Sequence, residues 1–504
     1  MSEFTQQDLR QLKERGMDPD EIRAQIGHFR TGFPKAVLDR PATPGDGIHS
    51  FTGNVVRDLE RYYDDHAGAL KPVKFVPASG AASRMFKALF SFEEEPVKEL
   101  MAGLEKIAFF RALDETLVRL HGKGADQLRK ENNDRLIIDG ILSEQGLHYA
   151  SLPKGLLLFH DYPDGPRTAA EEHLVETASY ARDADGIARI HFTISPEHRE
   201  KFSELFRQAV PGLEKRFGVR YEITFSEQKP STDTIAVDED NQPFRNDDGS
   251  LLFRPGGHGA LISNLNDLDG GIIFIKNIDN IAPDRLKPDT ILYKKALGGF
   301  LLEIMDTVHS FLEKADQDQV DERCLGDVRF LMNNILFMPL PGDFRKKTVA
   351  EQTDFLYDYL SRPIRVCGMV RNEGEPGGGP FWVRGHGGRL SLQIIESSQV
   401  NLEDPQQKEI LGSSTHFNPV DLVCCIKDHQ GGKFDLRRFT DPDTGLVTTK
   451  SSGGNVLKAQ ELPGLWNGAM ADWITVFAEV PLSTFNPVKT VNDLLRQEHR
   501  WSEE

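Results

Sequence analysis

The sequence predicts an α/β fold, with a mostly parallel sheet flanked by helices, on three observations. Short apolar strand candidates alternate with helical stretches along the chain. The strand candidate 73–76 runs into a turn of small residues and then into a helical pattern, which is a strand-loop-helix unit. The apolar run 271–276 ends in Asn277-Ile278-Asp279-Asn280, and α/β folds bind ligands where parallel strands end.

The elements before residue 150 are expected to be mainly helical. Two short helices are predicted within residues 1–30, because Asp18 can cap a helix that has Pro19 in its first turn and Glu21 as the third residue. The stretch 40–47 is rich in Pro, Gly, Thr and Asp, which predicts a linker. Apolar residues recur at helical spacing through 94–146, which predicts a helical insertion.

Strands resume after this insertion. Further strands are expected at 156–159, 189–194, 221–225, 364–369, 390–396 and 420–426, with helices at 196–210 and through most of 288–360. The expected domains are a helical segment with a linker at 1–68, a core at 69–495 with the insertion at 88–150, and a tail at 496–504.

Composition and charge restrict the classes of partner. The 504 residues, 38% of them hydrophobic, suffice for one large α/β domain with an appendage or for two domains. The net charge of −18 disfavours nucleic acid and anionic membranes, so an anionic substrate needs a local basic pocket. Four cysteines without a C-x-x-C pair, no apolar leader and no run of about 18 apolar residues together predict a cytoplasmic protein without a membrane span.

The loop from Ser79 to Arg84 has the composition of a phosphate-binding turn. Backbone N–H groups reach phosphate oxygens only where no large side chain intervenes, and a following helix adds its positive end. Ser79, Gly80 and Ser83 meet this need, and Arg84 would add a planar charged donor. The alternative is a tightly packed turn without a ligand.

Two charged residues lie next to predicted strands. Lys154 precedes the candidate 156–159 and could point at phosphate from the end of the sheet, or it is a solvent-exposed turn lysine. Asp279 is our choice for a magnesium ligand, because Mg²⁺ takes hard oxygen donors and commonly uses one or two carboxylates with substrate phosphates. The alternative is a structural turn aspartate.

A third candidate is the loop 253–261, in which glycines surround His258 ahead of a helix. Such a loop lets a flat base or a phosphate approach the main chain.

In sequence order, these motifs resemble those of the UDP-sugar pyrophosphorylases, which include UDP-glucose and UDP-N-acetylhexosamine pyrophosphorylases. The loop 79–84 resembles their G-G-x-G-T-R nucleotide loop, Lys154 stands in a similar P-K-G, and Gln228 resembles the glutamine that reads the base. Gly257 and His258 stand in a segment similar to the G-H-G loop beside base and sugar, and residues 277–280, including Asn277, resemble the metal-binding N-x-D-N.

Three later segments extend the resemblance, which covers about Lys71 to Leu495. The segment around Glu396 is similar to the V-E-Y-S-E-I that meets the sugar. Asn418 and Asp421 stand in a segment similar to F-N-x-x-N, whose last position can complete the metal site. Residues 485–495 resemble R-F-x-P-V-K-T...D-L-L, with Lys489 at the phosphate-contacting lysine.

The resemblance implies a Rossmann-like, GT-A type fold and a magnesium-dependent nucleotidyltransferase. Its substrates would be a nucleoside triphosphate and a sugar 1-phosphate, and its products an NDP-sugar, with UDP-sugar as the first choice, and pyrophosphate. Arg84, Lys154 and Lys489 would act on the phosphates, and Asp279 with Asp421 would hold Mg²⁺. The sugar, the base and the oligomeric state stay open. The whole chain also resembles a bacterial group named only as the domain-of-unknown-function 4301 family.

The chain departs from the pyrophosphorylase pattern at several positions. Ser79 and Ala82 replace glycines, and a Cβ at Ala82 would hinder a positive φ or crowd a triphosphate. Thr484 stands where an arginine is common, and the insertion separates Lys154 from the loop. Two alternatives therefore stay open: a GT-A type glycosyltransferase that uses a nucleotide sugar, and an inactive protein that binds nucleotide sugars.

Overall fold

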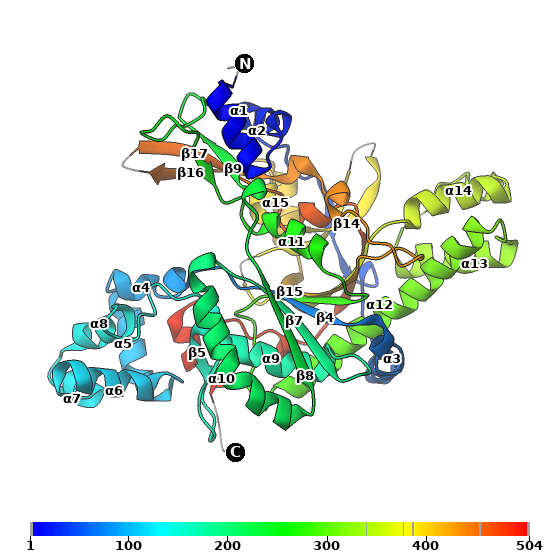
Figure 1. Ribbon diagram of the computed structural model, residues 1–504. Helices are drawn as coiled ribbons and strands as arrows, with labels where there is room; N and C mark the ends of the chain where they lie inside the picture. Colours follow the sequence, from blue (N-terminus) through cyan, green and yellow to red (C-terminus); the bar gives the residue numbers. More distant parts are fainter. Residues whose placement is uncertain (1–3, 339, 376, 386–387, 453–454, 501–504) are drawn as a thin grey trace. The chain divides into compact units, whose positions relative to one another are not determined.

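The structure is a computed structural model that describes residues 4–338, 340–375, 377–385, 388–452 and 455–500. Two compact units are distinguished, each built from three separate segments (Figure 1). The first unit comprises 1–70, 228–273 and 296–480, and the second comprises 71–227, 274–295 and 481–504. The predicted boundaries at 68 and 495 stay a prediction, and the last four residues of the predicted tail lie outside the described part of the chain.

The second unit contains strands in the order β11, β4, β7, β8. Their bounds are β4 (Val73–Pro77), β7 (Ile187–Thr193), β8 (Arg220–Ser226) and β11 (Ile273–Lys276). β4 pairs in parallel with β7, and β7 in parallel with β8. Helices α9 (Ala169–Tyr180) and α10 (Arg199–Phe217) contact this sheet, and β4 and β11 are buried over almost their whole length. The strands that carry the predicted ligand loops are therefore part of the buried core.

The segment predicted as a helical insertion also belongs to the second unit. It forms α4 (Lys87–Phe90), α5 (Glu94–Gly103), α6 (Phe110–His121), α7 (Ala125–Lys130) and α8 (Asp134–Leu142), coloured blue to cyan in Figure 1. Leu113 and Leu117 of α6 and Ile137 and Ile141 of α8 are fully buried. They belong to the same apolar core as the strands of this unit, so the insertion is packed as part of it.

The first unit contains strands in the order β2, β3, β18, β12, β15. Their bounds are β2 (Thr43–Pro44), β3 (Gly47–His49), β12 (Ile364–Arg371), β15 (His416–Cys425) and β18 (Ile474–Glu479). All these neighbours pair in parallel except β12 and β15, which are antiparallel. The large-sheet strands of both units are thus mostly parallel, and the predicted α/β class with a mostly parallel sheet flanked by helices is confirmed.

Smaller sheets and further helices complete the chain. One sheet consists of β1 (Leu38–Pro41), β13 (Gly379–Arg384) and β14 (Leu390–Ile395). A second consists of β10 (Phe253–Arg254), β9 (Thr234–Val237), β17 (Asn455–Glu461) and β16 (Leu446–Ser452). A third pairs β5 (Leu158–His160) with β6 (Arg167–Thr168). The remaining helices are α1 (Gln6–Arg15), α2 (Pro19–Thr31), α3 (Gly53–His66), α11 (Ile262–Asp267), α12 (Lys287–Asp316), α13 (Glu322–Phe330), α14 (Val349–Leu360) and α15 (Pro405–Gly412). In the part of the chain that is described, no helix combines the length and the apolarity needed to cross a membrane.

Two local predictions are wrong. The predicted linker 40–47 takes part in strands, because backbone hydrogen bonds pair β2 with β3 whatever the side chains are, and because Arg40 binds Asp46 through its side chain. The strand expected at 156–159 begins at Leu158 and pairs only with β6, while Lys154–Leu156 form a 3₁₀ turn. Lys154 therefore does not directly precede a strand of the large sheet.

Candidate functional site

Three segments of the second unit meet around Lys154. Its ammonium group donates to Asp279 Oδ2 at 2.6 Å and to the carbonyl oxygen of Val488 at 2.8 Å. The backbone N–H of Val488 in turn donates to the carbonyl oxygen of Asp279 at 3.0 Å. The side chains of Lys154 and Asp279 are 15% and 22% exposed, so this ion pair lies at the surface edge of a packed region and is open to a ligand.

The predicted phosphate loop lies beside this pair. Ala82 N–H donates to Leu152 O at 3.0 Å, and Ala81 forms an isolated bridge with Pro153. A Cβ placed on Gly80 would meet no atom within 4 Å, which means that the backbone of the loop has open space on that side. The loop is thus joined to the residues just before Lys154.

The loop differs from the prediction in two respects. A short 3₁₀ turn, Ala82–Arg84, takes the place of the expected helix start, and the helix that follows, α4, is only four residues long. A strong helix dipole is therefore absent from this loop. Ala82 does not adopt a positive φ, so the strain expected from its Cβ does not arise, although Ala82 is fully buried. Ser83 and Arg84 are exposed.

Lys489 is held next to the Asp279 loop by its backbone. The N–H groups of Lys489 and Thr490 donate to Asp493 Oδ2 at 2.8 and 2.7 Å. One segment earlier, Asn486 N–H donates to Asn280 Oδ1 at 2.9 Å, and Pro487 forms a bridge with Asn280. The Lys489 side chain is half-buried, with its Nζ 5.9 Å from the ring centre of Phe485.

The second unit therefore brings together most of the predicted phosphate-binding residues. Ser79, Gly80, Ser83, Arg84, Lys154, Asn277, Asp279 and Lys489 lie on segments that are hydrogen-bonded to one another or continuous with β11. These segments carry three cationic side chains, Arg84, Lys154 and Lys489, and Lys154 is ion-paired with the carboxylate of Asp279. Such a group can neutralise phosphates and offers one hard oxygen ligand to a cation.

The loop around His258 belongs to the first unit and serves internal packing. A Cβ on Gly259 would lie 2.0 Å from Pro463 O, and one on Gly256 would lie 2.4 Å from Thr232 O. These two glycines therefore allow chain segments to pack closely, and the expectation that they open the main chain to a ligand is wrong for them. Gly257 has φ +76°, a conformation that favours glycine.

His258 itself is fixed by the segment that packs on this loop. Its Nδ1 accepts a hydrogen bond from Leu465 N–H at 3.1 Å, and its ring stacks on Trp466 with the ring centres 4.4 Å apart. Burial lowers the pKa of His258, while the charges of Glu396 and Glu461 oppose that shift. The ring is therefore neutral at pH 7, with its proton on Nε2.

Two of the other predicted residues of the first unit, Glu396 and Asn418, border the same glycine: Asn418 N–H donates to Gly378 O at 2.8 Å, and a Cβ on Gly378 would lie 3.5 Å from Glu396 Cγ. Gln228 Nε2 is 3.4 Å from Asp233 Oδ1, and Glu396 begins the turn Ser397–Gln399. Asn418 Oδ1 accepts from Val420 N–H at 3.1 Å, and Asp421 is buried in β15. Because Asp421 and Asp279 belong to different units, the predicted shared metal site stays a prediction. Among the described residues, no cluster of three or more His, Cys, Asp or Glu side chains is placed to hold a metal ion.

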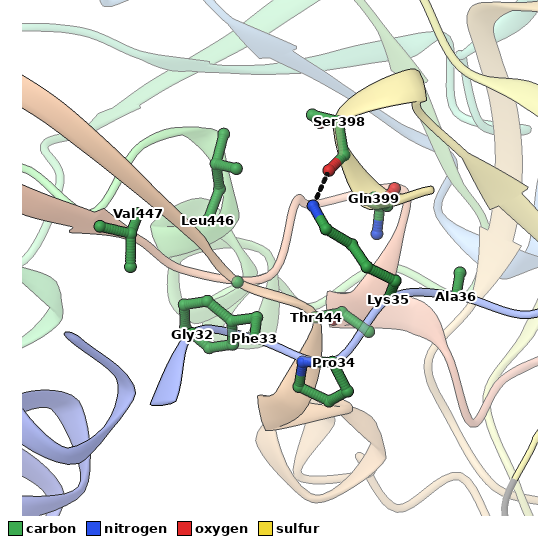
Figure 2. Close-up of a pocket in the computed structure, with 11 residues that line it drawn as sticks. Gly32, Phe33, Pro34, Lys35, Ala36, Ser398, Gln399, Thr444, Leu446 and Val447 are labelled. Carbon is green, nitrogen blue, oxygen red and sulfur yellow. Dashed lines mark hydrogen bonds between the residues drawn. The ribbon is translucent and has the colours of Figure 1, made fainter. Parts of the chain in front are cut away.

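A small cavity adjoins the segment that follows Glu396. It has a volume of about 210 Å³, and the residues that line it include Phe33, Lys35, Gln399 and Leu446 (Figure 2). Lys35 Nζ donates to Ser398 O at 2.8 Å across its rim. Its lining is mostly apolar and contains none of the predicted phosphate-binding residues.

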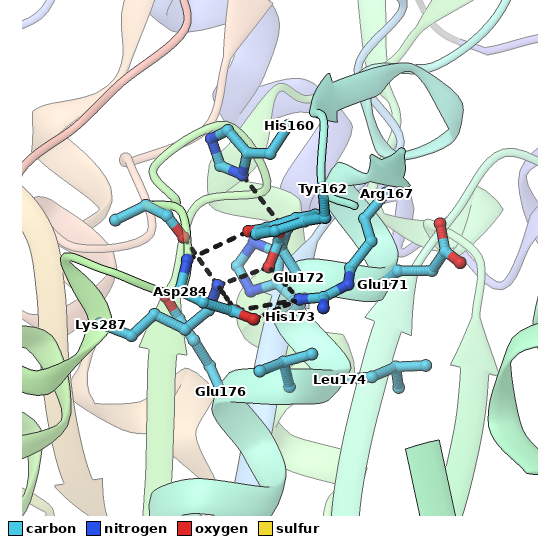
Figure 3. A network of polar contacts seen from close by, with 12 residues as sticks. His160, Tyr162, Arg167, Glu171, Glu172, His173, Leu174, Glu176, Asp284 and Lys287 are labelled. Carbon is cyan, nitrogen blue, oxygen red and sulfur yellow. Dashed lines mark hydrogen bonds and ion pairs between the residues drawn. The ribbon is translucent and has the colours of Figure 1, made fainter. Parts of the chain in front are cut away.

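Sequence reasoning missed a buried ionic network on α9. Glu172 accepts from Tyr162 Oη at 2.6 Å, contacts His160 Nδ1 at 3.0 Å and is paired with Lys287, as Figure 3 shows. Burial alone would raise the pKa of Glu172, but Lys287, His160 and Arg167 hold it well below its usual range.

This network supports the chain just after Asp279. Lys287 Nζ donates to Ala282 O at 2.8 Å, and Asp284 N–H donates to Tyr162 Oη at 3.1 Å. Arg167 completes it with two contacts to the carboxylate of Asp284, at 2.9 and 3.0 Å. The available signal was the presence of three acidic residues, Glu171, Glu172 and Glu176, in a helix that also carries Ala, Leu and Val.

Comparisons with known proteins give one family and several structural likenesses. The family model described as "Domain of unknown function (DUF4301)" matches residues 5–500. No curated protein matches the sequence. A mutant UDP-glucose pyrophosphorylase from Leishmania major is similar over 99% of this chain and 82% of its own, with 13% identity and a TM-score of 0.47. The UDP-N-acetylglucosamine pyrophosphorylase from Trypanosoma brucei is similar over 97% and 82%, with 11% identity and a TM-score of 0.48.

The family match covers nearly every residue between the two ends of the chain, including all the segments that meet around Lys154. The protein therefore belongs to the DUF4301 family.

Proposed function

We propose that this protein is a magnesium-dependent nucleotidyltransferase that forms an NDP-sugar and pyrophosphate from a nucleoside triphosphate and a sugar 1-phosphate. UDP-sugar is the product we propose first, on the motif resemblance to UDP-sugar pyrophosphorylases. The observation that carries the proposal is the meeting of Lys154, Asp279 and the segment of Lys489 beside a loop of small residues. Chemistry on two polyphosphates needs cations, a metal ligand and accessible backbone at one place.

The reaction is an in-line displacement in which a phosphate oxygen of the sugar 1-phosphate attacks the α-phosphorus and pyrophosphate leaves. Two anions must approach each other, so the main task of the protein is to position them and to offset their charge. Arg84, which is exposed, and Lys489, which is half-buried, are the first cations proposed for this task, and Lys154 joins them once it is released from Asp279.

Asp279 is the proposed ligand of Mg²⁺, with Asp421 as a second ligand. One or two carboxylates together with substrate phosphates are the usual donor set of this ion, which polarises the phosphates when bound. The carboxylate of Asp279 is partly exposed and already ion-paired, so its environment favours a cation.

The remaining proposed contacts are to nucleotide and sugar. They are Ser79, Gly80 and Ser83 in the phosphate loop, Gln228, Gly257, His258 and Asn277 for the nucleoside, and Glu396 and Asn418 for the sugar. The neutral, fixed ring of His258 is suited to a hydrogen bond with a base or a hydroxyl group.

A ligand screen followed by a product assay tests the proposal. Nucleoside triphosphates and sugar 1-phosphates are first compared by thermal shift with Mg²⁺ present, because a ligand that binds only the folded state raises the melting temperature. The pairs that stabilise the protein are then assayed for pyrophosphate, and release of pyrophosphate with an NDP-sugar is the expected result. Transfer from a nucleotide sugar without pyrophosphate would indicate a glycosyltransferase, and binding without turnover would indicate a binding protein. Either result contradicts the proposal.

A further inference from the structure

Helix α9 carries a second buried carboxylate, which contacts lysines from two different strands. Lys74 Nζ lies 2.6 Å from Glu176 Oε2, and Lys276 Nζ lies 2.8 Å from Glu176 Oε1. Glu176 and Lys74 are fully buried, and Lys276 is 1% exposed. Tyr180, one turn further along the helix, donates its hydroxyl to Glu176 Oε2 at 3.1 Å. One carboxylate therefore bridges two backbone segments.

These two strands are the ones that lead into the proposed phosphate site. Lys74 lies in β4, which runs directly into the loop that begins at Ser79. Lys276 is the last residue of β11, and the turn that follows carries Asp279. Glu176 thus joins the strand before the phosphate loop and the strand before the proposed metal ligand to the same helix.

The neighbouring residue of α9 makes a parallel contact. His173 Nε2 lies 3.2 Å from the carbonyl oxygen of Ile278, and Lys74 Nζ reaches the carbonyl oxygen of His173 at 3.4 Å. Burial lowers the pKa of His173 well below its usual value, so the ring is neutral and can donate to Ile278. The helix therefore holds the Asp279 turn at two consecutive points, Lys276 and Ile278.

The charges of this cluster argue against a role in stability alone. Burial alone would raise the pKa of Glu176, but Lys276 and Lys74 hold it well below its usual range, and the group stays ionised. Well-packed apolar residues often stabilise a core as well as a buried ion pair does, whereas a buried pair fixes which groups meet. Here the contacts fix which residues of β4 and β11 meet Glu176 of α9.

We propose that Glu176 is a positioning residue that sets the phosphate loop and Asp279 relative to each other through Lys74 and Lys276. The consequence for catalysis rests on the proposed function, whereas the structural consequence does not. The variants Lys74→Met and Lys276→Met test the two ion pairs of Glu176 separately, because each leaves Glu176 with one lysine partner.

Amide hydrogen exchange measures the proposal without any assay of activity. Glu176→Gln should speed exchange about ten-fold or more in peptides covering 78–84 and 277–283, because local opening becomes easier. Lys74→Met should do so only in 78–84 and Lys276→Met only in 277–283. Asp8→Asn is the matched control: Asp8 is also fully buried and paired with an arginine, Arg245, but in the first unit. It should leave both segments unchanged.

Two results would overturn the proposal. One is that all three variants exchange at the wild-type rate in both segments, and the other is that their exchange rates rise equally across the whole second unit. If Glu176→Gln does not fold, the two lysine variants decide the matter alone.

Steady-state kinetics distinguishes a positioning role from a purely structural one. Provided that the wild type releases pyrophosphate, Lys74→Met should mainly raise KM for the nucleoside triphosphate, and Lys276→Met should mainly lower kcat. Equal losses in both parameters that follow the melting temperature contradict the positioning role. If the wild type releases no pyrophosphate, the proposed function fails, and the exchange experiment still decides the role of Glu176.

Discussion

Lys154 and Asp279 form an ion pair, so a metal ion and the ammonium group compete for one carboxylate. The ammonium group occupies Asp279 Oδ2 at 2.6 Å, a position that suits a divalent cation. A metal ion that binds Asp279 has to displace Lys154, and the displaced ammonium group is then available to phosphate. We therefore expect Lys154→Met to bind Mn²⁺ more tightly than the wild type in the absence of nucleotide, while its turnover falls.

Titration calorimetry with Mn²⁺ measures the first effect and pyrophosphate release the second. Asp279→Asn is the control that should lose both metal affinity and turnover. Weaker metal binding by Lys154→Met would show that Lys154 supports the metal site and does not compete for it.

The variant Lys489→Ala removes one positive charge from the proposed site. The backbone N–H of Lys489 donates to Asp493 Oδ2, and Lys489→Ala keeps this contact. Removing one charge contact to the transition state costs roughly two to three decades in rate. We expect a fall of this size in kcat with an unchanged melting temperature, measured by pyrophosphate release and calorimetry. Full activity of Lys489→Ala would remove this residue from the site.

Asp8 allows a test of pH dependence away from the site. A hydrogen bond from Arg245 lowers the pKa of Asp8 to about 2, so its stabilising effect is present above pH 4 and is lost as pH falls towards 2. A shift of about two units corresponds to roughly 2.5 kcal/mol, and solvent screening of the partly exposed Arg245 reduces this to about 1 kcal/mol. Denaturant titrations should therefore show Asp8→Asn less stable than the wild type at pH 6, with the difference shrinking at pH 3. A difference that grows on acidification would contradict this assignment.

Single residues of the site could be predicted where they belong to a sequence motif. They were missed where charged side chains, which usually face solvent, are buried. Lys154, Asp279 and Lys489 were each suggested by their place in a motif, and the structure brings their segments together. Glu172 and Glu176 were missed, because charged residues in a helix are normally taken to face solvent. Only the contacts of α9 reveal that its acidic residues face buried lysines.

At the level of elements, the helical insertion has a specific contact with the segment that carries Lys489. Asn492 Nδ2 donates to Pro96 O at 3.0 Å and to Glu99 Oε2 at 2.7 Å, both in α5. A Cβ on Gly103 at the end of α5 would lie 2.6 Å from Leu495, and Val491 N–H donates to Met85 O at 3.1 Å. The insertion therefore forms part of the support of the proposed site.

Asn492→Ala tests this support. Loss of these hydrogen bonds costs about 1 kcal/mol, and the turn 491–495 that holds Lys489 through Asp493 becomes less ordered. We expect KM for the sugar 1-phosphate or the triphosphate to rise about five-fold, as a free energy of this size implies. Asn333→Ala, at an exposed asparagine of the first unit, should leave the kinetics unchanged. Identical kinetics of both variants would assign the insertion no part in the site.

Elements were predictable where side chains carry a clear pattern. β4, β7, β8, β11 and β12 were found as apolar runs, within a few residues of their observed ends. β2 and β3 were read as a linker because they are short and contain Pro and Gly, and their pairing is made by the backbone alone. The glycines around His258 were read as a ligand loop, although their role in close packing depends on Pro463 and Thr232, far away in the sequence.

For the whole molecule, the class of fold was predictable from the sequence, but the division of the chain into two compact units was not. Alternation of strands and helices is a local property, and it led to the observed mostly parallel α/β class. Each of the two units is assembled from three separate stretches of chain, and no composition shift marks where the chain passes from one to the other.

The net negative charge of the whole chain affects how an anionic substrate reaches the proposed basic site. A net charge of −18 repels polyphosphates at long range, so binding depends on Arg84, Lys154 and Lys489 at short range. We expect KM for the triphosphate to fall when moderate salt screens this repulsion, as steady-state assays over a range of ionic strength would measure. A steep rise in KM over the same range would indicate that attraction by a wider basic surface dominates.

The most direct test of the account is pyrophosphate release by the wild type and by Asp279→Asn, with Mg²⁺ and after chelation by EDTA. The account predicts equal amounts of pyrophosphate and NDP-sugar from the wild type with Mg²⁺, a loss of both on chelation, and little of either from Asp279→Asn. Pyrophosphate release that is undiminished in Asp279→Asn, or absent from the wild type with every triphosphate and sugar 1-phosphate that binds, would contradict it.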